Sequence, residues 1–102
     1  MKLHIHYTFK AKIWLYQGGK ASWHFITLPK KQSEQIKFFE GGLRRGWGSV
    51  PVTVTIGKTT WKTSIFPDTK SGSYFLPLKA DVRKKEKIGV DDTVSVSLEA
   101  KS

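Results

Sequence analysis

The sequence predicts a mainly β fold: a six-stranded barrel with pseudo-twofold symmetry, built from two ββαβ halves with two short helices. Six segments alternate apolar and polar residues, which is the period of a β-strand. Two lysine-bearing segments, each following a strand that ends at proline, have helical patterns, and this order repeats as residues 1–56 and 57–102. Because neither half of about fifty residues could bury a sheet alone, residues 1–102 should form one domain with a shared core.

The first half contains three predicted strands and one helix. Residues 3–16 alternate strictly between apolar and polar side chains. Residues 17–20 hold paired glycines, which permit the positive φ angles of a tight turn. Residues 21–28 are short and aromatic-rich, as strands prefer, and residues 31–40 place apolar side chains on one helical face. Residues 49–56 form the most regular strand of the chain.

The second half repeats this order. Residues 59–66 follow a glycine turn and alternate as a strand, and residues 73–76 form a shorter strand after a polar loop. A second helix is predicted over residues 79–87. Residues 93–99 alternate valine and leucine with polar residues, which predicts the last strand.

Glycine and proline mark the predicted ends of these elements. Pro29 and Pro77 should each stop a strand, because proline cannot donate a ladder hydrogen bond. Gly41 and Gly42 are predicted to cap the first helix in the left-handed conformation, and Gly89 is predicted to end the second.

The core should contain the inward residues of several strands. We expect one contiguous cluster that includes a residue of the second strand and valines of the third and last strands. The expected members are the odd-numbered residues from Ile5 to Ile13, Trp23 or Phe25, Val52, Val54, Val94 and Val96.

The charge is large and uneven. The chain has a net charge of +10, and residues 1–64 carry eleven basic against two acidic residues, a net of +9. Polyanions are the natural partners for such a field: DNA or RNA, acidic proteins or an anionic lipid surface. Basic charge also serves solubility alone. With no cysteine, no signal-peptide pattern and no apolar run long enough for a membrane span, we expect a cytoplasmic protein that does not bind membranes and is monomeric.

Two groups of residues are candidates for binding a polyanion. Arg44 and Arg45 could grip a phosphate while Trp47, between two glycines, stacks on a base; alternatively, Trp47 simply caps the barrel. A basic cluster on the fourth strand and second helix could position phosphates, or it could be an ordinary solvated surface. Its candidate binding residues are Lys62, Lys79 and Arg83.

The sequence predicts neither a metal site nor catalysis. His4 and His6 share a strand face, but no third ligand lies near them in the sequence. Lys62 and Ser64 also share a face, yet no oxyanion-binding feature accompanies them. No paired carboxylates, phosphate loop or dinucleotide fingerprint occurs, so we expect no enzyme and no cofactor.

The aromatic residues allow two interpretations. Trp14, Trp23, Trp61 and Phe66 are most simply core residues. The alternative is that they line a ligand pocket between the two halves of the barrel.

Several motifs span most of the chain: Trp23-x-Phe25, Arg45-Gly46-Trp47-Gly48-x-Val50-Pro51-Val52, Ile56-Gly57, Trp61-x-Thr63-Ser64-x-Phe66-Pro67 and Tyr74-x-Leu76-Pro77-Leu78-Lys79-Ala80-x-Val82-Arg83. Together they resemble the bacterial domain-of-unknown-function family numbered nineteen hundred and five. The resemblance implies a double-split β-barrel. Longer relatives in that family carry a region associated with the YdeI/OmpD-associated family. Residues 74–98 are also similar to the swapped-hairpin module of AbrB-type regulators and MazE-type antitoxins, which form the barrel from two chains and bind DNA.

The sequence therefore predicts a non-catalytic binding module, with nucleic acid held mainly through backbone phosphates as the leading expectation. The alternative is a small-ligand or protein-interaction domain whose basic charge is incidental.

Overall fold

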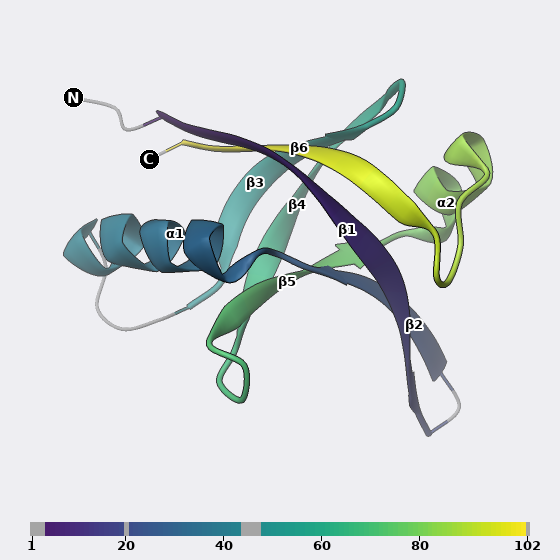
Figure 1. Cartoon of the computed structure of the whole chain (residues 1–102), viewed down its shortest axis with the longest axis horizontal. Helices are drawn as coiled ribbons and strands as arrows, with labels where there is room; N and C mark the ends of the chain where they lie inside the picture. The colour runs from purple at the N-terminus through teal and green to yellow at the C-terminus, as the bar shows by residue number, and fades with distance from the viewer. Residues whose placement is uncertain (1–3, 20, 44–47, 102) are drawn as a thin grey trace.

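The computed structural model describes residues 4–19, 21–43 and 48–101, and within them six strands and two helices follow one another in the predicted order (Figure 1). The elements are β1 (His4–Gly18), β2 (Ala21–Thr27), α1 (Lys30–Leu43), β3 (Val50–Ile56), β4 (Thr59–Asp68), β5 (Ser73–Leu78), α2 (Ala80–Glu86) and β6 (Thr93–Lys101). The order ββαβ thus occurs twice, as predicted.

The strands form a closed antiparallel barrel in the order β1-β2-β5-β4-β3-β6. Exchanging β1 with β4, β2 with β5 and β3 with β6 leaves this cyclic order unchanged. The topology therefore has the predicted pseudo-twofold symmetry, and the β2–β5 and β3–β6 pairings cross its axis. The predicted six-stranded barrel with two helices is confirmed.

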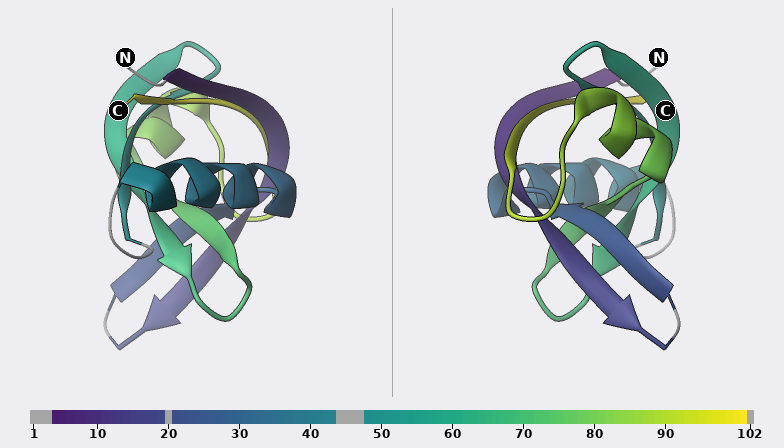
Figure 2. Two further views of the ribbon diagram at one scale, coloured as in Figure 1. Left: turned by 90° about the vertical axis from the view of Figure 1, so that its left-hand side faces the viewer. Right: turned by 90° about the vertical axis from the view of Figure 1, so that its right-hand side faces the viewer.

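Each long strand changes partners partway along its length. Residues 4–12 of β1 pair with β6, whereas residues 13–18 pair with β2. In the same way, β4 pairs with β3 as far as Ile65 and with β5 from Phe66 onward. The barrel wall consequently divides into two sheets, and the β1–β2 hairpin projects beyond the barrel at the end seen at the bottom of both views in Figure 2.

The helices are anchored at matching positions of the two halves. In α1, the buried Ser33 hydroxyl accepts the Tyr74 backbone N–H at 3.0 Å. In α2, Arg83 lies at the corresponding position, since Ser33 and Arg83 each donate their backbone N–H to the residue preceding the helix. The Arg83 guanidinium lies against His24 of β2.

Most of the expected core residues are buried, while Tyr7 and Ala11 are partly buried and pack against the core. Phe9, Ile13, the valines of β3 and the inward face of β6 form one buried cluster. The side chain of Ile5 lies outside the described residues. The buried apolar residues are Phe9, Ile13, Ile26, Leu28, Ile36, Val50, Val52, Val54, Ile56, Ile65, Tyr74, Leu76, Leu78, Val82, Val94, Val96, Leu98 and Ala100.

The prediction for β2 was wrong. Ile26 and Leu28 are fully buried, while Trp23 is 54% exposed and Phe25 is only half-buried. Apolar side chains occur at both even and odd positions of this strand, so hydrophobic alternation could not decide which face is inward. A shift of one residue exchanges the two faces, and here the aromatic face points outward.

Several predicted boundaries also differ, among them those of α1, α2 and β5. α1 continues through Gly41 and Gly42 to Leu43, because glycine permits a left-handed cap but does not impose one. α2 ends before Gly89, with Lys87 in the left-handed region at φ 55°. β5 continues through Pro77 to Leu78. The pairing of β5 with β4 ends at Phe75, so Pro77 has no partner in β4 and its missing N–H breaks no hydrogen bond to that strand. Among the described residues, no helix is long and apolar enough to cross a membrane.

Among the described glycines with positive φ, Gly57, in the turn between β3 and β4, is the position where a side chain should cost most. Gly57 and Gly19 both have positive φ, of 59° and 61°, but only at Gly57 would a Cβ atom meet a neighbour, the Glu86 carboxylate. That carboxylate accepts the Thr59 hydroxyl at 2.6 Å, so moving it would also break this hydrogen bond.

We expect Gly19→Ala to destabilise the protein by about 1 kcal/mol through backbone strain alone, and Gly57→Ala by roughly 1 kcal/mol more. Urea unfolding of the two variants and the parent measures the difference. Equal losses would show that the contact between Glu86 and the turn contributes nothing to stability.

Candidate ligand-binding groove

Four aromatic rings form a row on the outside of the barrel. Trp14, Phe25, Phe75 and Phe66 come from β1, β2, β5 and β4, which are consecutive in the barrel. Each directly neighbours a fully buried residue: Ile13, Ile26, Leu76 or Ile65. Because successive side chains of a strand point to opposite faces, the four rings project away from the core. We call them the aromatic row.

The rings of the aromatic row touch in sequence across the four strands. The Trp14 and Phe25 centroids are 5.0 Å apart, those of Phe25 and Phe75 are 4.8 Å apart in an edge-to-face arrangement, and those of Phe75 and Phe66 are 5.8 Å apart and stacked. These are favourable geometries for aromatic pairs. The Trp14 indole is further held by a 2.9 Å hydrogen bond from Nε1 to the Thr27 hydroxyl.

The aromatic row shares the symmetry of the barrel. Trp14 is the register partner of Phe25, and Phe66 is the register partner of Phe75, so the two ring pairs occupy equivalent positions in the two halves. The central contact, between Phe25 and Phe75, lies where β2 pairs with β5 across the pseudo-twofold axis. Neither half could form the row without the other.

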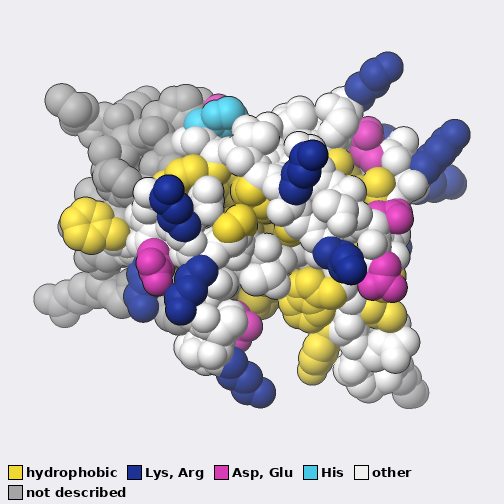
Figure 3. All heavy atoms as spheres, in the orientation of Figure 1, with side chains coloured by type: hydrophobic (Ala, Val, Ile, Leu, Met, Phe, Trp, Pro, Cys, Tyr) yellow, Lys and Arg dark blue, Asp and Glu magenta, His cyan; other side chains and the backbone are white. Residues whose placement is uncertain are grey.

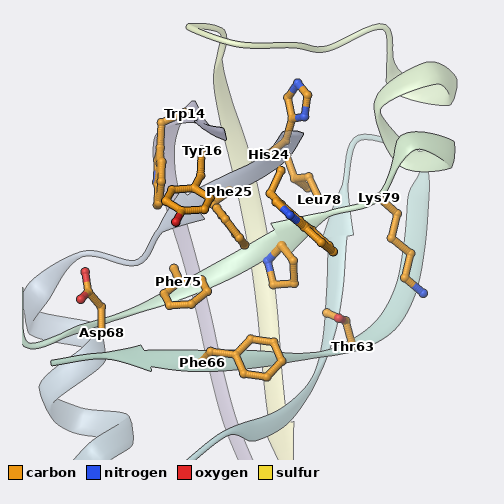
Figure 4. Close-up of a pocket in the computed structure, with 12 residues that line it drawn as sticks. Trp14, Tyr16, His24, Phe25, Thr63, Phe66, Asp68, Phe75, Leu78 and Lys79 are labelled. Atoms are coloured by element: carbon orange, nitrogen blue, oxygen red, sulfur yellow. The ribbon is translucent and has the colours of Figure 1, made fainter. Parts of the chain in front are cut away.

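The aromatic row lines an open groove of about 760 Å³, which we call the aromatic groove (Figure 4). This volume suits a small organic ligand. Hydrophobic side chains are also visible at the surface beside the β1–β2 hairpin in Figure 3. The residues that line the groove are Trp14, Tyr16, Trp23, His24, Phe25, Thr63, Phe66, Asp68, Phe75, Pro77, Leu78 and Lys79.

Among the residues that line the groove, His24 is the one whose pKa is clearly shifted by its surroundings. Burial, with a contribution from the nearby Arg83 guanidinium, lowers the pKa of His24 below its usual value of 6.5. The Arg83 Nη1 atom lies 3.5 Å from Nε2 of His24, and because arginine only donates, Nε2 must accept. The proton of the neutral ring is then on Nδ1, which is buried and has no partner among the described residues.

The two charged residues of the lining lie at opposite ends of the groove in Figure 4. The Asp68 carboxylate accepts the Lys70 backbone N–H at 3.1 Å and the Ser71 hydroxyl at 3.0 Å, so it organises the turn between β4 and β5. Lys79, directly before α2, is exposed.

The structure describes three of the six basic and aromatic residues that the sequence offers as binding candidates. Arg44, Arg45 and Trp47 lie outside the described residues. Lys62 is exposed on β4, and Lys79 lines the aromatic groove. Arg83 is half-buried and lies against His24, so its guanidinium is committed to a contact between β2 and α2. Figure 3 shows Lys and Arg side chains spread over the visible face with acidic side chains among them, rather than gathered in one stripe.

The alternative prediction for the aromatic residues describes the structure better than a role in the core. Trp14, Trp23 and Phe66 line a groove between the two halves of the barrel, as that alternative required. Trp61 does not line it: this side chain packs against the core cluster, and its Nε1 has no partner among the described residues.

Four further lining residues were not predicted from the sequence: Phe25, Phe75, Tyr16 and Pro77. The signal was the two apolar neighbours Phe25-Ile26 and Phe75-Leu76, each of which must place one residue outside. Within the described part of the chain, no three His, Cys, Asp or Glu side chains come close enough to hold a metal ion.

Comparison with known families gives one match. A family model described as a domain of unknown function (DUF1905) matches residues 9–98. No curated protein is similar enough to this sequence to be matched. The further resemblances to YdeI/OmpD-associated proteins and to AbrB-type or MazE-type modules stay predictions.

The environment of His24 predicts a pH dependence of stability. The pKa of His24 is lower in the folded than in the unfolded protein, where it is near 6.5. Above pH 6.5 the ring is neutral in the unfolded chain too, so His24 costs the folded state nothing. The free energy of unfolding falls as the pH drops below 6.5. His24→Gln should reduce this loss in urea unfolding measured above and below that pH. The control is His6→Gln, at an exposed position of β1. An unchanged loss in His24→Gln, or an equal change in both variants, would contradict the assignment.

Proposed function

The chain belongs to the DUF1905 family, whose description assigns no activity, and from the groove itself we propose that it is a non-catalytic module that binds a small apolar ligand. The observation that carries this proposal is the continuous aromatic row, whose ring centroids lie 4.8–5.8 Å apart along a groove of about 760 Å³.

The core does not need these rings. The inward faces of the same strands already fill the barrel with aliphatic side chains. Trp14 and Phe66, at the two ends of the aromatic row, remain 37% and 40% exposed, so their burial is incomplete in the protein alone. A contiguous exposed apolar surface of this kind is typical of a binding site. A ligand would complete the burial that the fold leaves unfinished.

The polar groups of the lining support binding rather than catalysis. Tyr16 and Thr63 supply hydroxyl groups, but neither is hydrogen-bonded to a base in the described structure, as an activated nucleophile would be. His24 faces Arg83, a cation that disfavours its protonated form, and Asp68 is held by its own turn. Few polar groups converge on one point, which is the arrangement of a site that orients a ligand without transforming it.

Nucleic acid held through its phosphates is a second candidate, and the net charge of +10 favours it. Lys62 and Lys79 are both exposed, and Lys79 is next to aromatic rings that could stack on bases. Arg44, Arg45 and Trp47, which lie outside the described residues, are the further candidates that the sequence offers for such a partner.

Removing a ring at the end of the row should weaken ligand binding. We expect Phe66→Ala to reduce the affinity for a neutral apolar dye about tenfold or more, because a ring of this size accounts for ~1–3 kcal/mol of contact. Phe38→Ala is the matched control, since Phe38 is a phenylalanine on α1 that is 80% exposed and does not line the groove. Dye fluorescence titrations measure both. Equal binding by the two variants, or no binding by the parent, would reject the groove as the site.

Salt dependence separates the second candidate from the first. If phosphates are bound, retardation of random DNA or RNA should be seen at low salt and should weaken linearly in log salt, with Lys62→Gln lowering the slope by about one. Binding of an apolar dye should change little over the same range. No retardation at low salt would eliminate nucleic acid as a partner.

A further inference from the structure

We infer that the ligand of the aromatic groove is an organic anion: a planar apolar body whose negatively charged group pairs with Lys79. This inference rests on the proposed function and specifies its ligand. The groove is lined by two charged residues, Asp68 and Lys79, and they differ in their contacts within the protein.

The carboxylate in the lining, that of Asp68, is hydrogen-bonded within the protein. Each carboxylate oxygen of Asp68 accepts a hydrogen bond from the turn that follows β4, one from the Lys70 N–H and one from the Ser71 hydroxyl. The Asp68 carbonyl also accepts the Gly72 N–H at 2.8 Å. Asp68 is thus held in place by the turn, at the end of the groove opposite Lys79 (Figure 4).

The positive charge is available. Lys79 forms no ion pair or side-chain hydrogen bond with any described residue, and its side chain is exposed. Its backbone is nevertheless well placed, because its carbonyl accepts the Arg83 N–H at 3.1 Å in the first turn of α2. The ammonium therefore extends from a fixed point at the end of the groove opposite Asp68 (Figure 4). A second cation at His24 is disfavoured, because burial and the neighbouring Arg83 guanidinium lower its pKa.

The symmetry of the barrel shows that this charge is a feature of one half only. Lys79 and Pro29 each directly precede a helix, so they are equivalent positions, and proline carries no charge. Asp68 and Tyr16 are likewise equivalent, each lying two residues beyond the end of the aromatic row. The two halves supply matching aromatic rings, but only the second half supplies charged residues at the ends of the groove. A ligand with a charged group at one end would therefore bind in one orientation.

The chemistry between the ends favours an apolar body over a nucleotide. A base is recognised through hydrogen bonds to its edges as well as by stacking. Between Asp68 and Lys79 the lining is mainly aromatic and aliphatic, and the Tyr16 and Thr63 hydroxyls, the Trp23 indole and His24 are the few groups that could contact a base edge. An aromatic carboxylate matches this lining, with its rings against the row and its carboxylate at Lys79. A charge-assisted contact beside an apolar surface is stronger than one in open solvent.

The test compares naphthoate with its neutral methyl ester, which has the same ring system without the charge. Calorimetric titrations at neutral pH and low ionic strength would use the parent protein, Lys79→Gln and Lys84→Gln. The last variant removes an equal charge from an exposed position of α2 that does not line the groove. We expect Lys79→Gln to bind naphthoate about five- to tenfold more weakly, with ester binding unchanged, and Lys84→Gln to resemble the parent.

Several results would overturn the inference. Ester binding without any preference for naphthoate, or equal loss of naphthoate affinity in both lysine variants, would remove the role of Lys79 and leave the groove as a site for neutral ligands. Tighter binding of adenosine monophosphate than of naphthoate would replace the apolar body by a nucleotide. Failure of both naphthalene probes to bind the parent would overturn the proposed function together with this inference.

Discussion

The pairing of β2 with β5 across the pseudo-twofold axis is the contact on which both the barrel and the groove depend. It joins the two hairpins into one sheet, with Ile26 opposite Leu76 on the buried face. On the other face of the same two strands, Phe25 meets Phe75. One register therefore sets the packing of the core and the continuity of the aromatic row, and a shift of one residue would exchange the two faces.

The pseudo-twofold symmetry accounts for the aromatic row, and the differences between the two halves account for the charged residues at its ends. The equivalent ring pairs Trp14–Phe25 and Phe66–Phe75 arise because each long strand changes partners at an equivalent isoleucine, Ile13 or Ile65. The ends differ because only the second half places Asp68 and Lys79 there. The residues at the equivalent positions of the two helices also differ: α1 contacts the barrel through the Ser33 hydroxyl and α2 through the Arg83 guanidinium.

The sequence predicts the architecture well because alternation is a strong signal. The β3 and β6 patterns correctly assign their buried valines, since polar residues separate them. The same signal fails in β2, where Phe25 and Ile26 are both apolar and only tertiary pairing decides which one is inside. The groove depends on that decision. For this reason a pocket lined by Trp14, Trp23 and Phe66 was one of two open interpretations, and Phe75 was not a candidate at all. The binding role predicted from the charge stays a prediction: Arg83 lies against His24, and Figure 3 shows basic side chains spread over the visible face.

The central claim is that both halves of the barrel jointly bind an apolar ligand through the aromatic row. The most direct measurement is mapping of backbone and ring NMR chemical shifts during titration with a neutral naphthalene derivative. The account predicts that the largest changes occur together at Trp14, Phe25, Phe66 and Phe75, one ring from each of four strands. Changes restricted to one half, centred on α1, or absent at saturating probe would contradict it.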